Sequence, residues 1–323
     1  MRTIPSIRIA HLPTPVEALP RLTAELGGPT LLVKRDDLTG LAFGGNKIRK
    51  LEYLLAEARA NGAQTVITTG AVQSNHCRQT AAACARLGFS CILVLSGEKP
   101  TTASGNLLLD QLFNAELVWT STEERNQMLN TTFQNAWDAG RRPYLVPYGG
   151  SNTTGATAFV YAIQELLTQR YTPDWIVFAS SSGGTQAGLV AGVKLYGFKG
   201  KVLGISVDEP ADVLKERVAT LATSTTDVLG EKAIILAQDI LVSDKYLGAG
   251  YGILGIPEIE AIHLFARTEG LLLDPVYTGR AAAGMIDLIN QGYFKSDETV
   301  LFWHTGGTPA IFSDRYSHLV KPL

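Results

Sequence analysis

The stretch "LAFGGNKIRKLEYLLAEA", residues 41–58, joins a glycine-rich loop to a strongly patterned helix. In its second half the apolar side chains recur three and four positions apart, which predicts an amphipathic helix. Gly44 and Gly45 let the backbone bend and approach a ligand closely, and Asn46 is a common helix N-cap. Lys47 therefore falls in the first helical turn. The positive end of the helix dipole disfavours an ammonium group at that place.

Lys47 has two explanations at this point. Most lysines are solvated surface groups, and this one fits that description as well as any. A lysine whose pKa is lowered is instead a nucleophile toward carbonyl compounds. The remainder of the chain has to decide between the two.

The composition indicates a globular chain that binds small molecules. Its 323 residues are 46% hydrophobic, enough for about two packed domains. The net charge of −2 leaves no basic field for nucleic acid or for an anionic membrane surface. The N-terminal residues lack the apolar run of a signal peptide, and no stretch is apolar enough to span a membrane. We therefore expect a cytoplasmic protein.

Three cysteines, Cys77, Cys84 and Cys91, follow one another at seven-residue spacing. An odd number in one segment is unlike a disulfide framework, and zinc sites prefer shorter gaps between ligands. Free cysteine commonly packs as a small apolar residue. We expect reduced, buried thiols and no metal site.

Short β-rich runs alternate with helical patterns along the chain. The predicted strands lie in residues 65–70, 91–97, 116–121, 144–150, 175–185, 201–208 and 299–307. The predicted helices between them lie near residues 48–58, 78–88, 105–115, 123–139, 154–169 and 186–196. This alternation predicts an α/β fold with two doubly wound, open parallel-sheet lobes, in which ligands bind beyond the carboxyl ends of the strands. The Ser/Thr-rich run near Thr223 is expected to be a loop.

Three predicted strand ends present glycine and small polar residues. The first, in residues 175–192, passes from an apolar strand through three serines and two glycines into a helix, which suits a phosphate. It lacks the Walker A lysine, and a plain strand-to-helix turn is the alternative. The second, residues 73–76, offers donors for a carboxylate at a helix start, or a simple N-cap. The third, residues 302–312, ends in Thr305 and two glycines, and its His304 is expected to be packed rather than catalytic.

A primary amine, a phosphate site and a carboxylate site together describe an amino acid held on pyridoxal phosphate. The cofactor's aldehyde condenses with a lysine, and its ring delocalises the electron pair left at the substrate α-carbon.

Four motifs carry a resemblance that covers nearly the whole chain: "GGNKIRKLEYL", "QSNHCRQTAA", "SSGGTQAGL" and "ARTEGLLLDPVYTGRAAAGM". They resemble the family of pyridoxal-phosphate enzymes that holds 1-aminocyclopropane-1-carboxylate deaminase and D-cysteine desulfhydrase, with the tryptophan synthase β-like fold. The resemblance implies an active site in the cleft between the lobes. We expect a large cofactor-binding domain of residues 1–50 plus 155–323, and a small domain of residues 51–154.

The resemblance also implies roles for individual residues. Lys47 would bond to the cofactor's aldehyde and move protons at the α-carbon, and Asn75 would contact the ring hydroxyl. The expected phosphate ligands are Lys50, Ser181, Ser182, Gly183, Gly184 and Thr185. The expected ligands of the substrate carboxylate are Ser74, Asn75 and His76, and the residues expected to close over the substrate are Tyr251 and Tyr277.

One position departs from the deaminase pattern. Thr278 stands where the deaminase has a glutamate whose carboxylate keeps the pyridine nitrogen protonated. A hydroxyl, from Thr278 or more readily from Thr305, leaves that nitrogen largely neutral and stabilises a carbanion less. Chemistry that discharges the carbanion at once is then favoured, and a thiolate leaves readily. His76 also replaces a glutamine usual in the deaminase.

The resulting hypothesis is a carbon–sulfur lyase that converts D-cysteine to pyruvate, ammonia and hydrogen sulfide. The D configuration comes from the resemblance alone. Release of sulfite from L-cysteate is the nearest alternative, followed by opening of the cyclopropane amino acid. A catalytically silent protein that binds pyridoxal phosphate is the alternative outside enzymes. A homodimer is the family's usual state and the commonest symmetric assembly.

Overall fold

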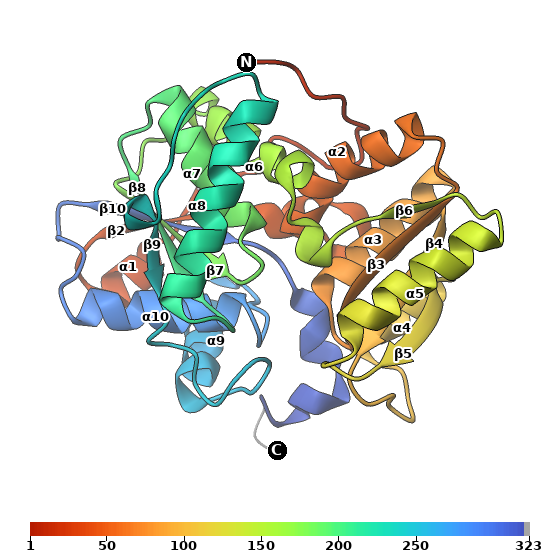
Figure 1. Cartoon of the computed structure of the whole chain (residues 1–323). Helices are drawn as coiled ribbons and strands as arrows, with labels where there is room; N and C mark the ends of the chain where they lie inside the picture. The colour runs from red at the N-terminus through yellow and green to blue at the C-terminus, as the bar shows by residue number, and fades with distance from the viewer. Residues whose placement is uncertain (320–323) are drawn as a thin grey trace.

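The computed structural model describes residues 1–319, which form an α/β fold of two lobes, each built on its own sheet (Figure 1). All strand pairs in both sheets are parallel except the pair β1 and β2. Helices cover both faces of each sheet. The fold class predicted from the alternation of strands and helices is confirmed.

The larger sheet has six strands within the described residues, in the order β1-β2-β10-β7-β8-β9. These strands are β1 Val16–Ala18, β2 Thr30–Arg35, β7 Trp175–Ser180, β8 Lys201–Ser206, β9 Leu241–Ser243 and β10 Thr299–His304. The last residues of β2 and β10 are paired, as are those of β7 and β8. The loops that follow these four strands therefore leave the sheet at one edge, where parallel-sheet proteins bind ligands.

Two helical layers cover the larger sheet, and both are mainly apolar. One layer comprises α1 Pro20–Leu26, α9 Ile256–Glu269 and α10 Thr278–Asn290. The other comprises α6 Thr153–Thr168 and α7 Gly184–Tyr196, with α8 Ala211–Val228 packed outside them. Burial of these apolar faces on the sheet is the main favourable term for folding this lobe.

The smaller sheet has the order β5-β4-β3-β6 within the described residues. Its strands are β3 Thr65–Ala71, β4 Ser90–Ser96, β5 Glu116–Thr120 and β6 Pro143–Leu145. One face packs on α2 Asn46–Ala60, α3 Asn75–Leu87 and α4 Gly105–Leu112, and the other face packs on α5 Arg125–Asp138. The three cysteines are free and buried, as the sequence predicted.

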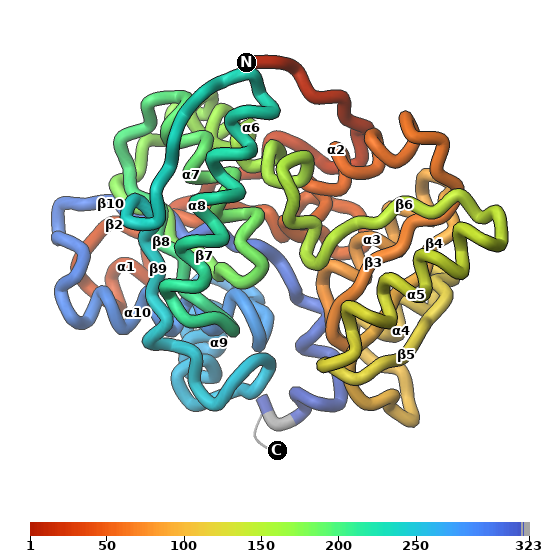
Figure 2. Tube along the Cα trace, viewed as in Figure 1, coloured from red at the N-terminus to blue at the C-terminus, as the bar shows by residue number. Residues whose placement is uncertain are grey.

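The chain passes between the lobes more than once (Figure 2). It leaves β2 through α2, builds the smaller sheet, and returns through α6. The C-terminal segment, drawn in blue, lies beside the small lobe, where the Asp314 backbone N–H donates to Ser104 Oγ at 3.2 Å. The short helices are η1 Asp36–Leu38, η2 Leu41–Phe43, η3 Tyr148–Gly150, η4 Ala237–Asp239, η5 Thr308–Phe312 and η6 Asp314–Leu319.

The loop predicted near Thr223 is wrong, because α8 continues through this run to Val228. The hydroxyls of Ser224 and Thr225 donate to carbonyl oxygens four residues back, at 2.9 and 2.7 Å. These bonds satisfy the polar side chains within the helix, so the run needs no loop. Across residues 1–319, the structure contains no helix with the length and apolar character that a membrane crossing requires.

Candidate active site

A cavity between the lobes brings together most of the residues predicted for the site. Its lining residues are Asn46, Lys47, Ser74, Asn75, His76, Tyr148, Gly149, Ala179, Ser180, Ser181, Ser182, Gly183, Thr185, Tyr277 and Thr305. None of these lining residues is an aspartate or a glutamate. Four predicted residues, Lys50, Gly184, Tyr251 and Thr278, lie outside this lining.

Lys47 lies in the first turn of α2, as the sequence predicted. Burial away from water lowers the pKa of its amine to about 8, while the carboxylate of Asp208 acts in the opposite direction. A pKa near 8 leaves roughly a tenth of the amines neutral at pH 7. The structure therefore favours the nucleophile over the surface lysine.

The loop before α2 requires its two glycines. Gly44 has φ +63°, and a Cβ there would collide with the Asp37 carbonyl oxygen. Gly45 has φ +124°, and a Cβ would lie 2.5 Å from the Gln79 side chain. Gly45, rather than Asn46, is the N-cap of α2, so the predicted capping role of Asn46 is wrong. The Asn46 amide instead donates to Thr185 Oγ1 at 3.0 Å and so joins α2 to α7.

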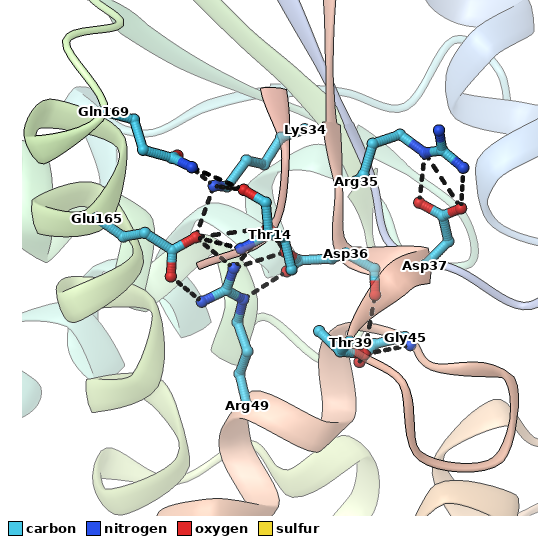
Figure 3. Close-up of polar contacts among 10 residues, drawn as sticks. All are labelled: Thr14, Lys34, Arg35, Asp36, Asp37, Thr39, Gly45, Arg49, Glu165 and Gln169. Atoms are coloured by element: carbon cyan, nitrogen blue, oxygen red, sulfur yellow. Dashed lines mark hydrogen bonds and ion pairs between the residues drawn. The ribbon is translucent and has the colours of Figure 1, made fainter. Parts of the chain in front are cut away.

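A buried ion network holds α2 against the larger lobe (Figure 3). Arg49 donates to Asp36 Oδ1 and Oδ2 at 2.8 and 2.9 Å, and to both carboxylate oxygens of Glu165 at 2.9 Å. Lys34 donates to Glu165 Oε1 at 2.6 Å and to the Thr14 carbonyl oxygen at 2.7 Å. The network joins α2 to β2 and α6, and thereby fixes the helix that carries Lys47.

The predicted phosphate site is at the start of α7. Lys50 Nζ donates to the Gly149 carbonyl oxygen at 3.0 Å and to Ser151 Oγ at 3.2 Å. Ser151 Oγ also lies 2.8 Å from Ser182 Oγ and accepts from the Gly184 N–H at 3.2 Å. A Cβ on Gly184 would lie 2.9 Å from Lys50 Nζ, so only glycine lets the amine approach the helix start this closely.

The charges around Lys50 and the start of α7 favour the binding of an anion. Burial and the neighbouring Lys47 lower the pKa of Lys50 well below its ordinary value. A phosphate between these amines and the first N–H groups of α7 would relieve their repulsion and satisfy the helix start. Thr185 Oγ1 accepts from Asn46, so its own proton is free to be donated.

Ser181 differs from the other residues of the loop. Its hydroxyl donates to Asp208 Oδ2 at 2.8 Å. A serine has one hydroxyl proton, so this proton is not available to a phosphate in the observed arrangement. The hydroxyl of Ser182, rather than that of Ser181, lies next to Ser151, which binds Lys50.

Ser74 and Asn75 open α3 on the small-lobe side. Ser74 is the N-cap, and its Oγ accepts from the Cys77 N–H at 3.2 Å, so its proton remains available to a carboxylate. Asn75 Oδ1 accepts from Asn106 Nδ2 at 2.9 Å, which leaves the Asn75 NH₂ as the donor. That NH₂ points to Gly307, whose missing Cβ would lie 2.7 Å from it.

The imidazole of His76 acts as a hydrogen-bond donor through Nε2. Thr68 Oγ1 donates to the Val146 carbonyl oxygen at 2.8 Å, so it can only accept from His76 Nε2, also at 2.8 Å. Burial, with Lys47 and Lys50 nearby, lowers the pKa of His76 well below its ordinary value. The ring is therefore neutral, with its proton on Nε2. Its contribution to a carboxylate is limited to the backbone N–H.

Two tyrosines meet at one wall of the site. The hydroxyls of Tyr251 and Tyr277 lie 2.6 Å apart, and the rings are in edge contact with centroids 6.0 Å apart. Burial raises the pKa of both phenols well above the ordinary value, so both are protonated. Because the pair uses one of its two protons internally, the other is available to a ligand.

The two threonines considered for the ring nitrogen are placed differently. Thr278 is buried at the start of α10, and its hydroxyl donates to Asp274 Oδ1 at 2.8 Å. Thr305 lines the cavity directly after β10. His304 is packed: its Nδ1 accepts from the Gly306 N–H at 3.1 Å, and its side chain is 1% exposed.

Sequence reasoning missed four residues of this site: Asn106, Tyr148, Ser151 and Asp208. Asn106 fixes the amide orientation of Asn75, and Ser151 joins Lys50 to the loop before α7. Tyr148 lines the cavity, and Asp208 binds Ser181. Asp208 is the last residue of the strand predicted over residues 201–208, and this position at a strand end is the one sequence signal that pointed toward the ligand edge of the sheet.

The donor set fits pyridoxal phosphate. The fit rests on the glycine at position 184, whose Cβ would fill the space beside Lys50 Nζ, and on the buried amine of Lys47 with its lowered pKa. Lys47 would hold the aldehyde carbon, and Lys50, Ser182 and Thr185 would hold the phosphate.

Comparison with known proteins agrees with the site. The family model described as pyridoxal-phosphate dependent enzyme matches residues 7–306. The D-cysteine desulfhydrase of Salmonella choleraesuis (strain SC-B67) is 41% identical over 318 residues, which make up 96% of each chain. The D-cysteine desulfhydrase of Salmonella typhi is likewise 41% identical over 318 residues and 96% of each chain. A crystal structure described as an ACC deaminase homologue is 36% identical, with a TM-score of 0.90 over 98% of this chain and 97% of that one.

These matches extend over both lobes and include all the motifs on which the resemblance was based. The predicted family and cofactor are thereby confirmed, and the chain belongs to the family of pyridoxal-phosphate dependent enzymes.

Proposed function

We propose that this protein is a carbon–sulfur lyase that converts D-cysteine to pyruvate, ammonia and hydrogen sulfide. The observation that carries the proposal is the 41% identity to D-cysteine desulfhydrases over 96% of the chain. The absence of any carboxylate among the residues that line the cavity supports it. A carboxylate beside the ring nitrogen of the cofactor would keep it protonated, whereas the hydroxyl of Thr305 would leave it largely neutral. A neutral ring stabilises the carbanion less, and this favours substrates with a β-substituent that leaves readily.

Each residue of the site has a separate role in the proposed reaction. The bound cofactor supplies an aldehyde for the substrate amine and a ring that accepts the electron pair of the α-carbon. Ser74 Oγ and the first N–H groups of α3 orient the substrate carboxylate. Lys47, once neutral, takes the proton from the α-carbon. The Tyr251–Tyr277 pair offers a phenolic proton at the edge of the substrate.

Two other activities remain alternatives. L-Cysteate differs from cysteine in its β-substituent, which leaves as sulfite, and the cyclopropane amino acid requires cleavage of an unactivated ring. A catalytically silent cofactor-binding protein is the alternative outside enzymes. We also propose that the small domain comprises residues 51–154, which include all strands of the smaller sheet, and that the protein is a cytoplasmic homodimer.

A substrate panel tests the proposed function. Pyruvate formation is measured with D-cysteine, L-cysteine, L-cysteate, D-serine and 1-aminocyclopropane-1-carboxylate, and sulfide and sulfite are assayed in parallel. We expect turnover to be fastest with D-cysteine, with one sulfide released per pyruvate. Turnover of the cyclopropane substrate alone would refute the argument from Thr305 and Thr278.

The role of Lys47 is tested by Lys47→Ala, with the exposed Lys199→Ala as the control. We expect the Lys47 variant to lose both turnover and the visible absorption of the lysine-bound cofactor. The control should keep both. Retention of either signal at the wild-type level in Lys47→Ala would contradict the assignment.

A further inference from the structure

Asp208 is a carboxylate beside the site that has no role in the chemistry above. It lies two residues after β8, at the same edge of the sheet as the loop before α7. One oxygen, Oδ2, accepts from Ser181. The other, Oδ1, is buried and has no hydrogen-bond partner within residues 1–319. A buried acceptor of this kind favours a ligand that donates a hydrogen bond.

The carboxylate faces a cleft that adjoins the site. Asp208, Tyr148 and Tyr251 all line this cleft, which has a volume of about 590 Å³, and Tyr148 also lines the site cavity. A substrate whose carboxylate lies at Ser74 and whose β-substituent extends past Tyr148 therefore enters the cleft on the side of Asp208. The charge of this carboxylate reaches the site, because it partly opposes the lowering of the Lys47 pKa by burial.

The charges that line the cleft are mixed. The ionisable side chains other than tyrosine are those of Glu98, Arg125, Asp208, Asp314 and Arg315. Arg125 stacks over the ring of Tyr148, with its Cζ 4.7 Å from the ring centroid. Asp208 Oδ1 and Arg125 Nε are both buried without a partner within residues 1–319, so the cleft presents one free acceptor and one free donor. Three of the five ionisable residues are acids and two are bases, so the charge of the lining as a whole is negative.

We propose that Asp208 selects the substrate by the charge of its β-substituent: it admits neutral groups that donate a hydrogen bond, such as a thiol, and repels groups with a full negative charge, such as a sulfonate or a carboxylate. The proposal rests on the proposed function in that the ligand is an amino acid bound through the cofactor. It separates thiol substrates from sulfonate substrates by a single side chain that lines the adjoining cleft and not the site cavity.

Binding of two unreactive amino acids tests the proposal. Asparagine and aspartate have nearly the same shape, differ by one charge, and have no β-substituent that leaves readily. Their dissociation constants are measured by calorimetric titration of the cofactor-loaded protein at pH 8, with the D and L forms of each. We expect the wild type to bind asparagine at least about tenfold more tightly than aspartate of the same configuration, as one like charge at close range predicts.

Asp208→Asn removes the charge and keeps the shape, and it should reduce that preference by about tenfold. Glu209→Gln is the matched control, because it removes a charge from the next residue, whose carboxylate pairs with Arg217 at 2.8 Å. The control should keep the wild-type preference. An unchanged preference in Asp208→Asn, or a wild type that binds aspartate as tightly as asparagine, would overturn the proposal without need of any other variant.

The two hypotheses fail separately. If the amide is preferred but D-cysteine is not turned over, the charge selection stands and the proposed function is wrong. If D-cysteine is turned over and aspartate binds as tightly as asparagine, the proposed function stands and the role of Asp208 is wrong.

Discussion

Two buried groups of polar residues flank the candidate site, and they differ in how completely they are hydrogen-bonded. Toward the larger sheet, every buried side-chain atom of Arg49, Asp36, Lys34 and Glu165 has a partner (Figure 3). In the small lobe, buried side-chain atoms without a partner in the described chain occur in five residues of α3 and α4. These are His76, Arg78, Thr80, Asn106 and Asp110.

The difference separates a rigid side from an adaptable side. A satisfied ion network has one preferred arrangement, and breaking it exposes uncompensated charges, so α2 and its two lysines are held in place. Unpaired buried groups raise the free energy of their arrangement, so α3 and α4 gain from any rearrangement that supplies partners. We infer that the cofactor side of the site is preorganised and that the small-lobe side, which meets the substrate carboxylate, adjusts.

The largest expected effect comes from opening the satisfied network. Arg49→Met keeps the length of the side chain but removes the cation paired with Asp36, which keeps only the Thr14 hydroxyl, and one of the two cations paired with Glu165. We expect the free energy of unfolding to fall by about 3–5 kcal/mol, measured by urea denaturation at pH 7. Arg267→Met is the control, because its exposed pair with Glu25 should contribute less than about 1 kcal/mol. Equal losses in the two variants would contradict the comparison.

A second experiment uses pH to probe the same network. Hydrogen bonds and charges from Arg49 and Lys34 outweigh burial and lower the pKa of Glu165 to about 2 from an ordinary value of 4.5. A lowered folded-state pKa gives stability that is present above pH 4.5 and lost as the pH falls toward 2. Glu165→Gln should therefore cost about 2–3 kcal/mol at pH 7, and this difference should shrink in acid. A loss that does not depend on pH would show that shape, and not charge, matters at this position.

Sequence reasoning recovered the local features of the site and missed the long-range ones. The position of Lys47 follows from helix periodicity and from glycines next to it in the chain, and Ser74 follows from N-cap chemistry. Arg49 lies outside the apolar repeat of residues 48–58, yet its side chain is 2% exposed because Glu165 of α6 and Asp36 of η1 bind it. Neither contact can be predicted from residues 41–58 alone. Ser151 was missed for the same reason, since it meets Lys50 about a hundred positions away along the chain.

The small-lobe side can be tested at His76. Thr68→Val removes the acceptor of the His76 Nε2–H and leaves it buried without a partner, which should cost about 1–3 kcal/mol of unfolding free energy. Nitrogen chemical shifts of the imidazole report the tautomer directly. We expect the wild-type ring to be protonated on Nε2 alone. In the variant, we expect the ring to be no longer held in this one tautomer. A wild-type ring protonated on Nδ1 would contradict the hydrogen bond assigned from His76 to Thr68 in the small lobe.

The smallest expected effect has the opposite sign and concerns Asp110. Burial raises the pKa of this carboxyl well above its ordinary value, and the charge of Arg78 only partly opposes the shift. The folded state therefore binds a proton that the unfolded state releases above about pH 4, so Asp110 weakens the fold progressively as the pH rises. Asp110→Asn removes that cost. Its free energy of unfolding relative to wild type should rise between pH 4 and pH 8, by about 1 kcal/mol.

Urea denaturation at several pH values measures this slope, and Asp138→Asn on the exposed end of α5 is the control. Asp110 and Arg78 share no hydrogen bond in the described residues, so the substitution breaks no direct contact between them. Relative to wild type, Glu165→Gln should then lose stability as the pH rises, while Asp110→Asn gains it. The same slope for both variants would remove the distinction between the two sides, because it would mean that a carboxyl in the small lobe is as well compensated as one in the network of Figure 3.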